Sequence, residues 1–105
     1  MPEFVKAIVA ADLPPGQGTE ANVAGRAVAI FNVGGAFYAL SNTCLHRGGP
    51  LGEGQLEGKV VTCPWHSWEY DMTTGKTVQN PNTGVGCYAV EIRGEEIFVS
   101  LGQSP

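Results

Sequence analysis

The chain has 105 residues, a formal net charge of −4 and 43 % hydrophobic residues, so it holds one domain and is too apolar to be disordered. Its six basic residues are scattered, which argues against a binding surface for nucleic acid or an anionic membrane. We see no signal peptide and no apolar run of the roughly 20 residues that span a bilayer, and three cysteines are too few for a disulfide framework. These features predict a cytoplasmic protein.

The first part of the chain predicts strands separated by tight turns. Asp12–Gly16 contains two prolines and is expected to be a turn, and Gly34-Gly35 is typical of a two-residue hairpin. The segment 26–33 is apolar on both faces, as a doubly buried strand would be. The predicted strands here are 3–9, a weak one at 19–24, 26–33 and 36–41.

The middle of the chain, from about 42 to 82, has a different composition. It holds both histidines, two of the three cysteines and both tryptophans, and its one short apolar run is 59–62. Strand alternation returns at 85–93 and 97–101, joined by a turn at Gly94. No window shows a clean helical period. The chain is therefore expected to be all-β: a small antiparallel β-sandwich or barrel, one domain over 1–105, with an inserted loop-rich subdomain at about 42–82.

Two short motifs in that insert contain the residue types that bind metals. Cys44-Leu45-His46 is followed, after sixteen residues, by Cys63-Pro64-Trp65-His66. Cysteine thiolates and histidine imidazoles together bind soft or borderline metals. One use of four such ligands is a structural zinc site, but zinc sites draw their thiolates from one short knuckle, whereas each motif here mixes the two ligand types. The other use is a binuclear iron–sulfur cluster in which two histidines replace two cysteines on one iron.

The amino-acid sequence around these motifs resembles the Rieske family. The matching segments are C-L-H-R-G-G-P-L-G-E-G at 44–54 and C-P-W-H-S-W-E-Y-D at 63–71, and with the flanking strands the resemblance covers essentially the whole chain. It implies a Rieske 2Fe-2S cluster, one per chain, with Cys44 and Cys63 on one iron and His46 and His66 on the other.

The resemblance also assigns roles to the surrounding residues. The glycines at 48, 49, 52 and 54 would bring backbone N–H groups to the sulfides, and Asn80-Pro81-Asn82 would be part of a third, proline-containing loop over the cluster. Tyr70 would donate its hydroxyl to a cysteine sulfur, and one of Trp65 and Trp68 is expected to be partly exposed. For the glycines a plain flexible loop is the alternative, for 80–82 a plain turn, and for Tyr70 a packed strand aromatic. Cys87 is expected to be a structural residue.

The subclass follows from what the motifs lack. Respiratory Rieske proteins carry an extra cysteine in each cluster loop and a serine that donates to a sulfide, and here Gly48 or its neighbours, Trp65 and Trp68 stand at those places. The loss of these donors predicts a reduction potential toward the low end of the roughly −150 to +300 mV Rieske span. Oxygenase large subunits need further histidines and a catalytic domain that this chain does not have.

The resemblance therefore implies a one-electron carrier and not an enzyme. Such a protein takes electrons from an NAD(P)H-dependent flavin reductase and passes them to a terminal oxygenase, docking transiently near His46 and His66, and we expect it to be a monomer. Two alternatives remain open at this point. The chain could be the Rieske-type small subunit of an assimilatory nitrite reductase, or a zinc-stabilised binding module with no redox role.

Overall fold

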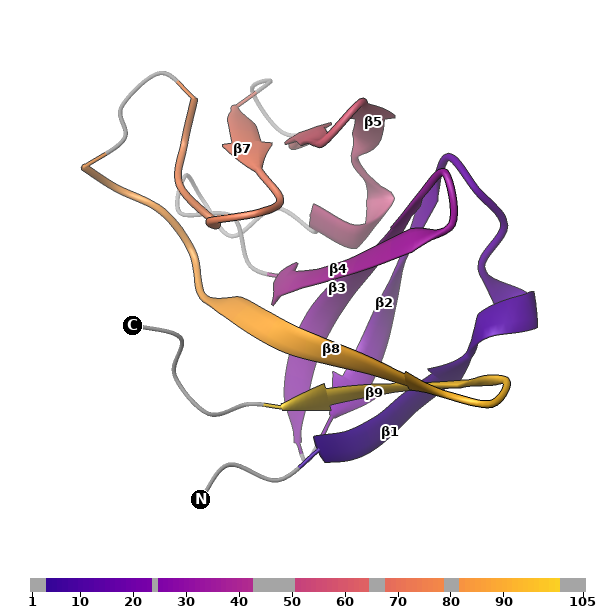
Figure 1. Cartoon of the computed structure of the whole chain (residues 1–105). Helices are drawn as coiled ribbons and strands as arrows, with labels where there is room; N and C mark the ends of the chain where they lie inside the picture. The colour runs from indigo at the N-terminus through magenta and orange to yellow at the C-terminus, as the bar shows by residue number, and fades with distance from the viewer. Residues whose placement is uncertain (1–3, 24, 43–50, 65–67, 79–81, 101–105) are drawn as a thin grey trace.

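The structure is a computed structural model, and it describes residues 4–23, 25–42, 51–64, 68–78 and 82–100. It is built from antiparallel strands, with two short 3-10 turns (Figure 1). The strands are β1 (Phe4–Val9), β2 (Gln17–Val23), β3 (Arg26–Val33), β4 (Ala36–Ser41), β5 (Gln55–Glu57), β6 (Val60–Thr62), β7 (Glu69–Asp71), β8 (Cys87–Arg93) and β9 (Glu96–Ser100). Within the described ranges, no helix is long and apolar enough to cross a membrane.

Six of the strands form the larger sheet, in the order β1-β9-β8-β4-β3-β2. The sheet curls until its edge strands β1 and β2 approach each other, which makes an almost closed barrel (Figure 1). The predicted hairpin between β3 and β4 is confirmed: Val33 pairs with Ala36, and the two glycines between them have φ of 59° and 97°. Positive φ at both turn positions is the type I′ requirement that glycine meets without steric cost.

The remaining three strands form a second, smaller sheet, in the order β5-β6-β7 (Figure 1). The sequence indicates one apolar run in this region, at 59–62, and β6 lies within that run. The strands β5 and β7 were missed because each is three residues long, which is too short for an alternation of polar and apolar residues to stand out. All-β architecture is confirmed, and the insert contains a small sheet of its own.

Other boundaries shifted by a few residues. The weak strand at 19–24 is in fact the full-length β2, which pairs with β3 from Gln17 to Val23. The strand expected from residue 85 begins at Cys87, and a 3-10 turn, η1 (Ala10–Asp12), precedes the proline-rich turn. Ile92 alternates in step with Tyr88 and Val90, but at the end of β8 its side chain is 45 % exposed.

The core has two layers, and β3 serves both. Val28 and Ile30 point into the barrel, where they join Ile97 and Val99. Ala29 and Phe31, on the other face of the same strand, pack under the smaller sheet. The prediction that 26–33 is buried on both faces is thereby confirmed. This second layer, which we call the inter-sheet core, consists of Ala29, Phe31, Leu40, Leu51, Val61, Cys63, Tyr70 and Met72.

Candidate metal centre

Of the four predicted ligands, the structure describes Cys63. It follows β6 directly and is only 1 % exposed, as a member of the inter-sheet core. Its backbone N–H donates to the Trp68 carbonyl at 2.7 Å, so Cys63 and Trp68 are joined across the four residues between them. Cys44, His46 and His66 lie outside the described residues, and their approach to Cys63 remains a prediction.

The backbone beside Cys63 is packed too closely for side chains. A Cβ on Gly54 would overlap the Thr62 carbonyl oxygen, and a Cβ on Gly52 would lie 2.8 Å from the Thr19 carbonyl carbon. Gly52 belongs to the 3-10 turn η2 (Leu51–Glu53), which leads into β5. Gly54 therefore allows the chain that leads into β5 to press against the end of β6, next to Cys63, and Gly52 allows η2 to press against β2.

Two glycines have a different role from the one that the family resemblance implied. The N–H of Gly52 donates to the side-chain oxygen of Asn42 at 2.7 Å, and the N–H of Gly54 donates to the Leu51 carbonyl at 2.9 Å. Both donors are thus used within the protein scaffold, not toward sulfides. Gly48 and Gly49 lie outside the described residues.

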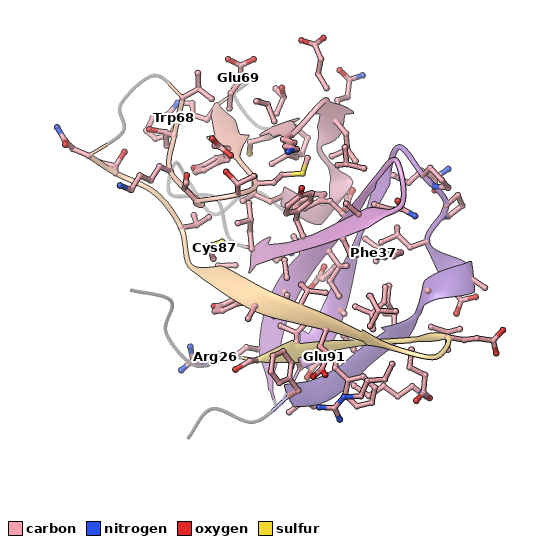
Figure 2. All side chains as sticks on the ribbon, viewed as in Figure 1. Arg26, Phe37, Trp68, Glu69, Cys87 and Glu91 are labelled. Carbon is pink, nitrogen blue, oxygen red and sulfur yellow. The ribbon has the colours of Figure 1, made fainter. Side chains whose placement is uncertain are left out.

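The aromatic residues near Cys63 lie partly as predicted. Tyr70 is fully buried in the inter-sheet core together with Cys63. Trp68 is half-buried against that core, while Glu69 lies further out on the smaller sheet (Figure 2). The hydroxyl–sulfur bond assigned to Tyr70 remains a prediction, and Trp65 and Asn80-Pro81 lie outside the described residues.

The third cysteine sits at the start of β8, below the smaller sheet (Figure 2). Cys87 is half-buried against the inter-sheet core, and its Sγ lies 3.6 Å from the Thr73 carbonyl oxygen and 3.8 Å from that of Met72. Burial raises the pKa of its thiol above the ordinary value of 9.0, and the negative charge of Asp71 raises it further. A thiol held protonated is a poor metal ligand, because the thiolate is the form that binds. Its surroundings are those of a structural residue.

The donor chemistry and the local packing fit an iron–sulfur group. A buried thiol directly follows a short strand, and the backbone of Gly54 packs closely against the end of that strand. Thiolates of this kind hold the iron of iron–sulfur electron carriers. The Rieske [2Fe-2S] domain model matches residues 3–92. The chain belongs to the Rieske family, and its cofactor is a Rieske 2Fe-2S cluster, which argues against the zinc alternative.

Curated relatives of similar length show which kind of Rieske protein this chain is similar to. The chain is 35 % identical over 99 residues to the ferredoxin CarAc of Metapseudomonas resinovorans, covering 92 % of each chain. It is 30 % identical over 100 residues to the ferredoxin component of the naphthalene 1,2-dioxygenase system of Pseudomonas aeruginosa, covering 94 % of this chain and 96 % of the relative. These relatives are electron-transfer components, and this chain is likewise an electron-transfer protein and not an enzyme.

Solved structures agree with the fold. A complex of reduced oxygenase and oxidized ferredoxin in carbazole 1,9a-dioxygenase includes a chain with 32 % identity and a TM-score of 0.86, matched over 97 % of this chain and 96 % of that one. A putative NADH-dependent nitrite reductase small subunit from Mycobacterium tuberculosis has a TM-score of 0.90 over 99 % of each chain, but at 20 % identity it shows the fold alone.

Proposed function

We propose that Cys44, His46, Cys63 and His66 hold one 2Fe-2S cluster per chain, the cysteines on one iron and the histidines on the other. The order of ligands in the sequence supports this set, and so does the burial of Cys63 at the end of β6. When bound, the cluster accepts and donates one electron at a time. The rest of the site, from about 42 to 82, would be the cluster-binding subdomain of a single domain spanning 1–105.

We further propose that the chain carries electrons from an NAD(P)H-dependent flavin reductase to a terminal oxygenase, as a cytoplasmic monomer. The observation that carries this proposal is the similarity, over more than nine-tenths of the chain, to ferredoxin components of dioxygenase systems. The solved complex of a related ferredoxin with its oxygenase supports docking to that partner. The nitrite reductase alternative has only fold similarity in its favour.

The surface beside the site suits a transient partner. Val78 is the most exposed large apolar side chain of the described residues, at 51 %, and its backbone N–H donates to the Glu69 carbonyl at 2.9 Å. This bond places Val78 next to β7 and the half-buried Trp68. An exposed apolar side chain here suits the small buried areas of weak, short-lived electron-transfer contacts.

The test combines spectroscopy with transfer kinetics. We expect about two irons and two sulfides per chain, and a reduced protein whose average EPR g value lies below that of the free electron. The reductase and terminal oxygenase of a carbazole dioxygenase system serve as surrogate partners, and stopped-flow absorbance should show the chain reduced by the first and reoxidised by the second. A protein without iron, or one reduced chemically but inert toward both partners, would contradict the proposal.

The same preparation tests the histidine ligands. Reduction adds negative charge beside the ligated imidazoles, so their pKa values are higher in the reduced state than in the oxidised state. Between those values reduction takes up a proton, and the potential therefore falls as the pH rises in the alkaline range. A potential that stays flat there would argue against histidine ligation.

A further inference from the structure

Hydrogen bonds join the two ends of each segment that the sequence assigns to the cluster. Before and after 43–50, Asn42 is bonded to Leu51 and Gly52. Across 64–67, the N–H of Cys63 donates to the Trp68 carbonyl at 2.7 Å. Across 78–82, the N–H of Thr77 donates to the Thr83 carbonyl at 2.9 Å. At the first of these junctions, a side chain also accepts a hydrogen bond from a backbone N–H, that of Gly52.

Asn42 is the centre of that junction. It is 6 % exposed and follows β4 directly. Its N–H donates to the carbonyl of Ala27 on the neighbouring strand β3 at 3.1 Å, and its carbonyl accepts from the Leu51 N–H at 2.8 Å. Its side-chain Oδ1 accepts from the Gly52 N–H at 2.7 Å. One residue thus ties the barrel to both of the first two residues of η2.

Gly52, which donates this hydrogen bond, is closely packed against Thr19 and Asn42. A Cβ at Gly52 would lie 2.8 Å and 2.9 Å from the Thr19 carbonyl carbon and oxygen, and 3.0 Å from Asn42 Oδ1. Gly52 is itself buried, so its N–H would lose its partner without gaining water if the amide oxygen were removed. The end of the segment 43–50 is therefore held in place both by contact and by the side-chain bond.

We propose that Asn42 is a positioning residue for the cluster, acting through its Oδ1 bond to Gly52 on the segment that carries Cys44 and His46. This inference rests on the ligand set proposed above. Loss of a hydrogen bond made directly to a metal ligand weakens metal binding about 10- to 100-fold. The Asn42 bond holds the segment that bears two proposed ligands and not a ligand itself, so we expect an effect at the lower end of that range. The bond spans ten residues and closes the segment at its base.

The chain offers a matched control at the other end of the same hairpin. Asn32 is 5 % exposed, and its Oδ1 accepts from the Gly35 N–H at 2.8 Å. Its Nδ2 donates to the Leu13 carbonyl at 2.8 Å. Asn32 and Asn42 are thus both buried asparagines bonded to a glycine N–H, but only Asn42 adjoins a predicted ligand segment. A merely structural role for Asn42 would make the two alanine variants behave alike.

The experiment compares Asn42→Ala, Asn42→Asp and Asn32→Ala as purified cluster-loaded proteins. Thermal unfolding, the EPR g values of the reduced state, the midpoint potential and the rate of iron release to a chelator are measured for each. We expect both alanine variants to unfold at lower temperature. Only Asn42→Ala should shift the g values and release iron faster, by about tenfold or more. Asn42→Asp keeps an acceptor for the Gly52 N–H and should return the release rate close to that of the wild type.

If Asn42→Ala does not fold, Asn42→Ser takes its place, because serine is polar but too short to make the bond to Gly52. We expect Asn42→Ser to release iron at the faster rate expected of Asn42→Ala. If the variants at Asn42 match Asn32→Ala in g values and iron release while the wild type carries its cluster, the inference is wrong and the proposed function stands. A wild-type protein without iron and sulfide would instead overturn the proposed function, and this inference with it.

Discussion

Cys63 and Cys87 both contact the inter-sheet core, but their surroundings give them different chemistry. Cys63 is buried directly after β6, whose last residue, Thr62, packs closely against the backbone of Gly54. Cys87 lies next to the carbonyl oxygens of Met72 and Thr73, and both burial and Asp71 raise the pKa of its thiol. Carbonyl oxygens and a carboxylate oppose a thiolate, so the surroundings of Cys87 suit packing, whereas Cys63 is the cysteine that we propose as a ligand.

Serine replacements separate these roles. Cys63→Ser removes a thiolate ligand, and we expect the iron content to fall from about two per chain to nearly none. Cys87→Ser should keep the iron, the sulfide and the EPR spectrum of the wild type. Metal analysis and EPR of the two purified variants check this. Equal loss of iron in both variants would mean that Cys87 takes part in the site.

The sequence alone could predict much at this scale, because residue type and spacing carry the information. Two cysteine–histidine pairs in a chain with two histidines indicate a metal site before any fold is known. No comparable sequence pattern indicates a role for Asn42. Its partner Gly52 lies ten positions away, and nothing in either residue type indicates that an amide oxygen meets that particular N–H.

At the scale of elements, the path from η2 through β5 to β6 brings Gly54 against the end of β6, next to Cys63. Gly54 ends the turn, β5 pairs with β6 from Gln55–Thr62 to Glu57–Val60, and Cys63 follows. A Cβ on Gly54 would overlap the Thr62 carbonyl oxygen and lie 2.8 Å from Val61 Cγ2. The hairpin can therefore close next to Cys63 only if residue 54 has no side chain.

Gly54→Ala should destabilise the protein more than a second glycine variant of the same hairpin. Gly58 has a φ of +59° and nothing within 4 Å of its missing Cβ, so Gly58→Ala should cost about 1 kcal/mol from backbone strain alone. Gly54→Ala must displace backbone and should cost about 3 kcal/mol. Urea unfolding of the two variants measures the difference, and iron content shows whether the site is affected. Equal costs would contradict the close packing at Gly54.

Elements differ in how well they can be predicted, and length is the physical reason. The strands 26–33 and 36–41 were predicted to the residue, because long apolar segments bounded by glycines specify their own ends. The three-residue strands β5 and β7 carry no readable period, and they exist because β6 lies between them and supplies hydrogen bonds to both.

At the scale of the whole molecule, charge should influence how the carrier meets its partners. The net charge of −4 favours a basic partner surface, and the exposed Glu53 lines the same hollow as Cys63 and Pro64. Charges beside the docking site steer association, whereas charges far from it contribute little once salt screens beyond roughly 10 Å. Glu95 lies in the exposed turn between β8 and β9, two strands of the larger sheet.

The rate of electron transfer to the surrogate oxygenase should therefore fall as salt is raised. At low salt, Glu53→Gln should lower the second-order rate constant about twofold, and Glu95→Gln should leave it unchanged. Stopped-flow mixing of the reduced protein with the oxygenase at several salt concentrations checks this. A rate that is independent of salt, or equal slowing by both variants, would place the docking surface elsewhere.

The sequence by itself determined the all-β class, the main hairpins, the family and the set of candidate ligands, because these depend on local pattern and residue type. The tertiary structure decided which glycine N–H groups are used by the scaffold, how deeply Cys63 is buried and which backbone N–H the Asn42 side chain accepts from. Those features depend on contacts between different elements, such as Gly52 with Thr19 of β2. Their distances are set only when η2 and the smaller sheet pack against the barrel.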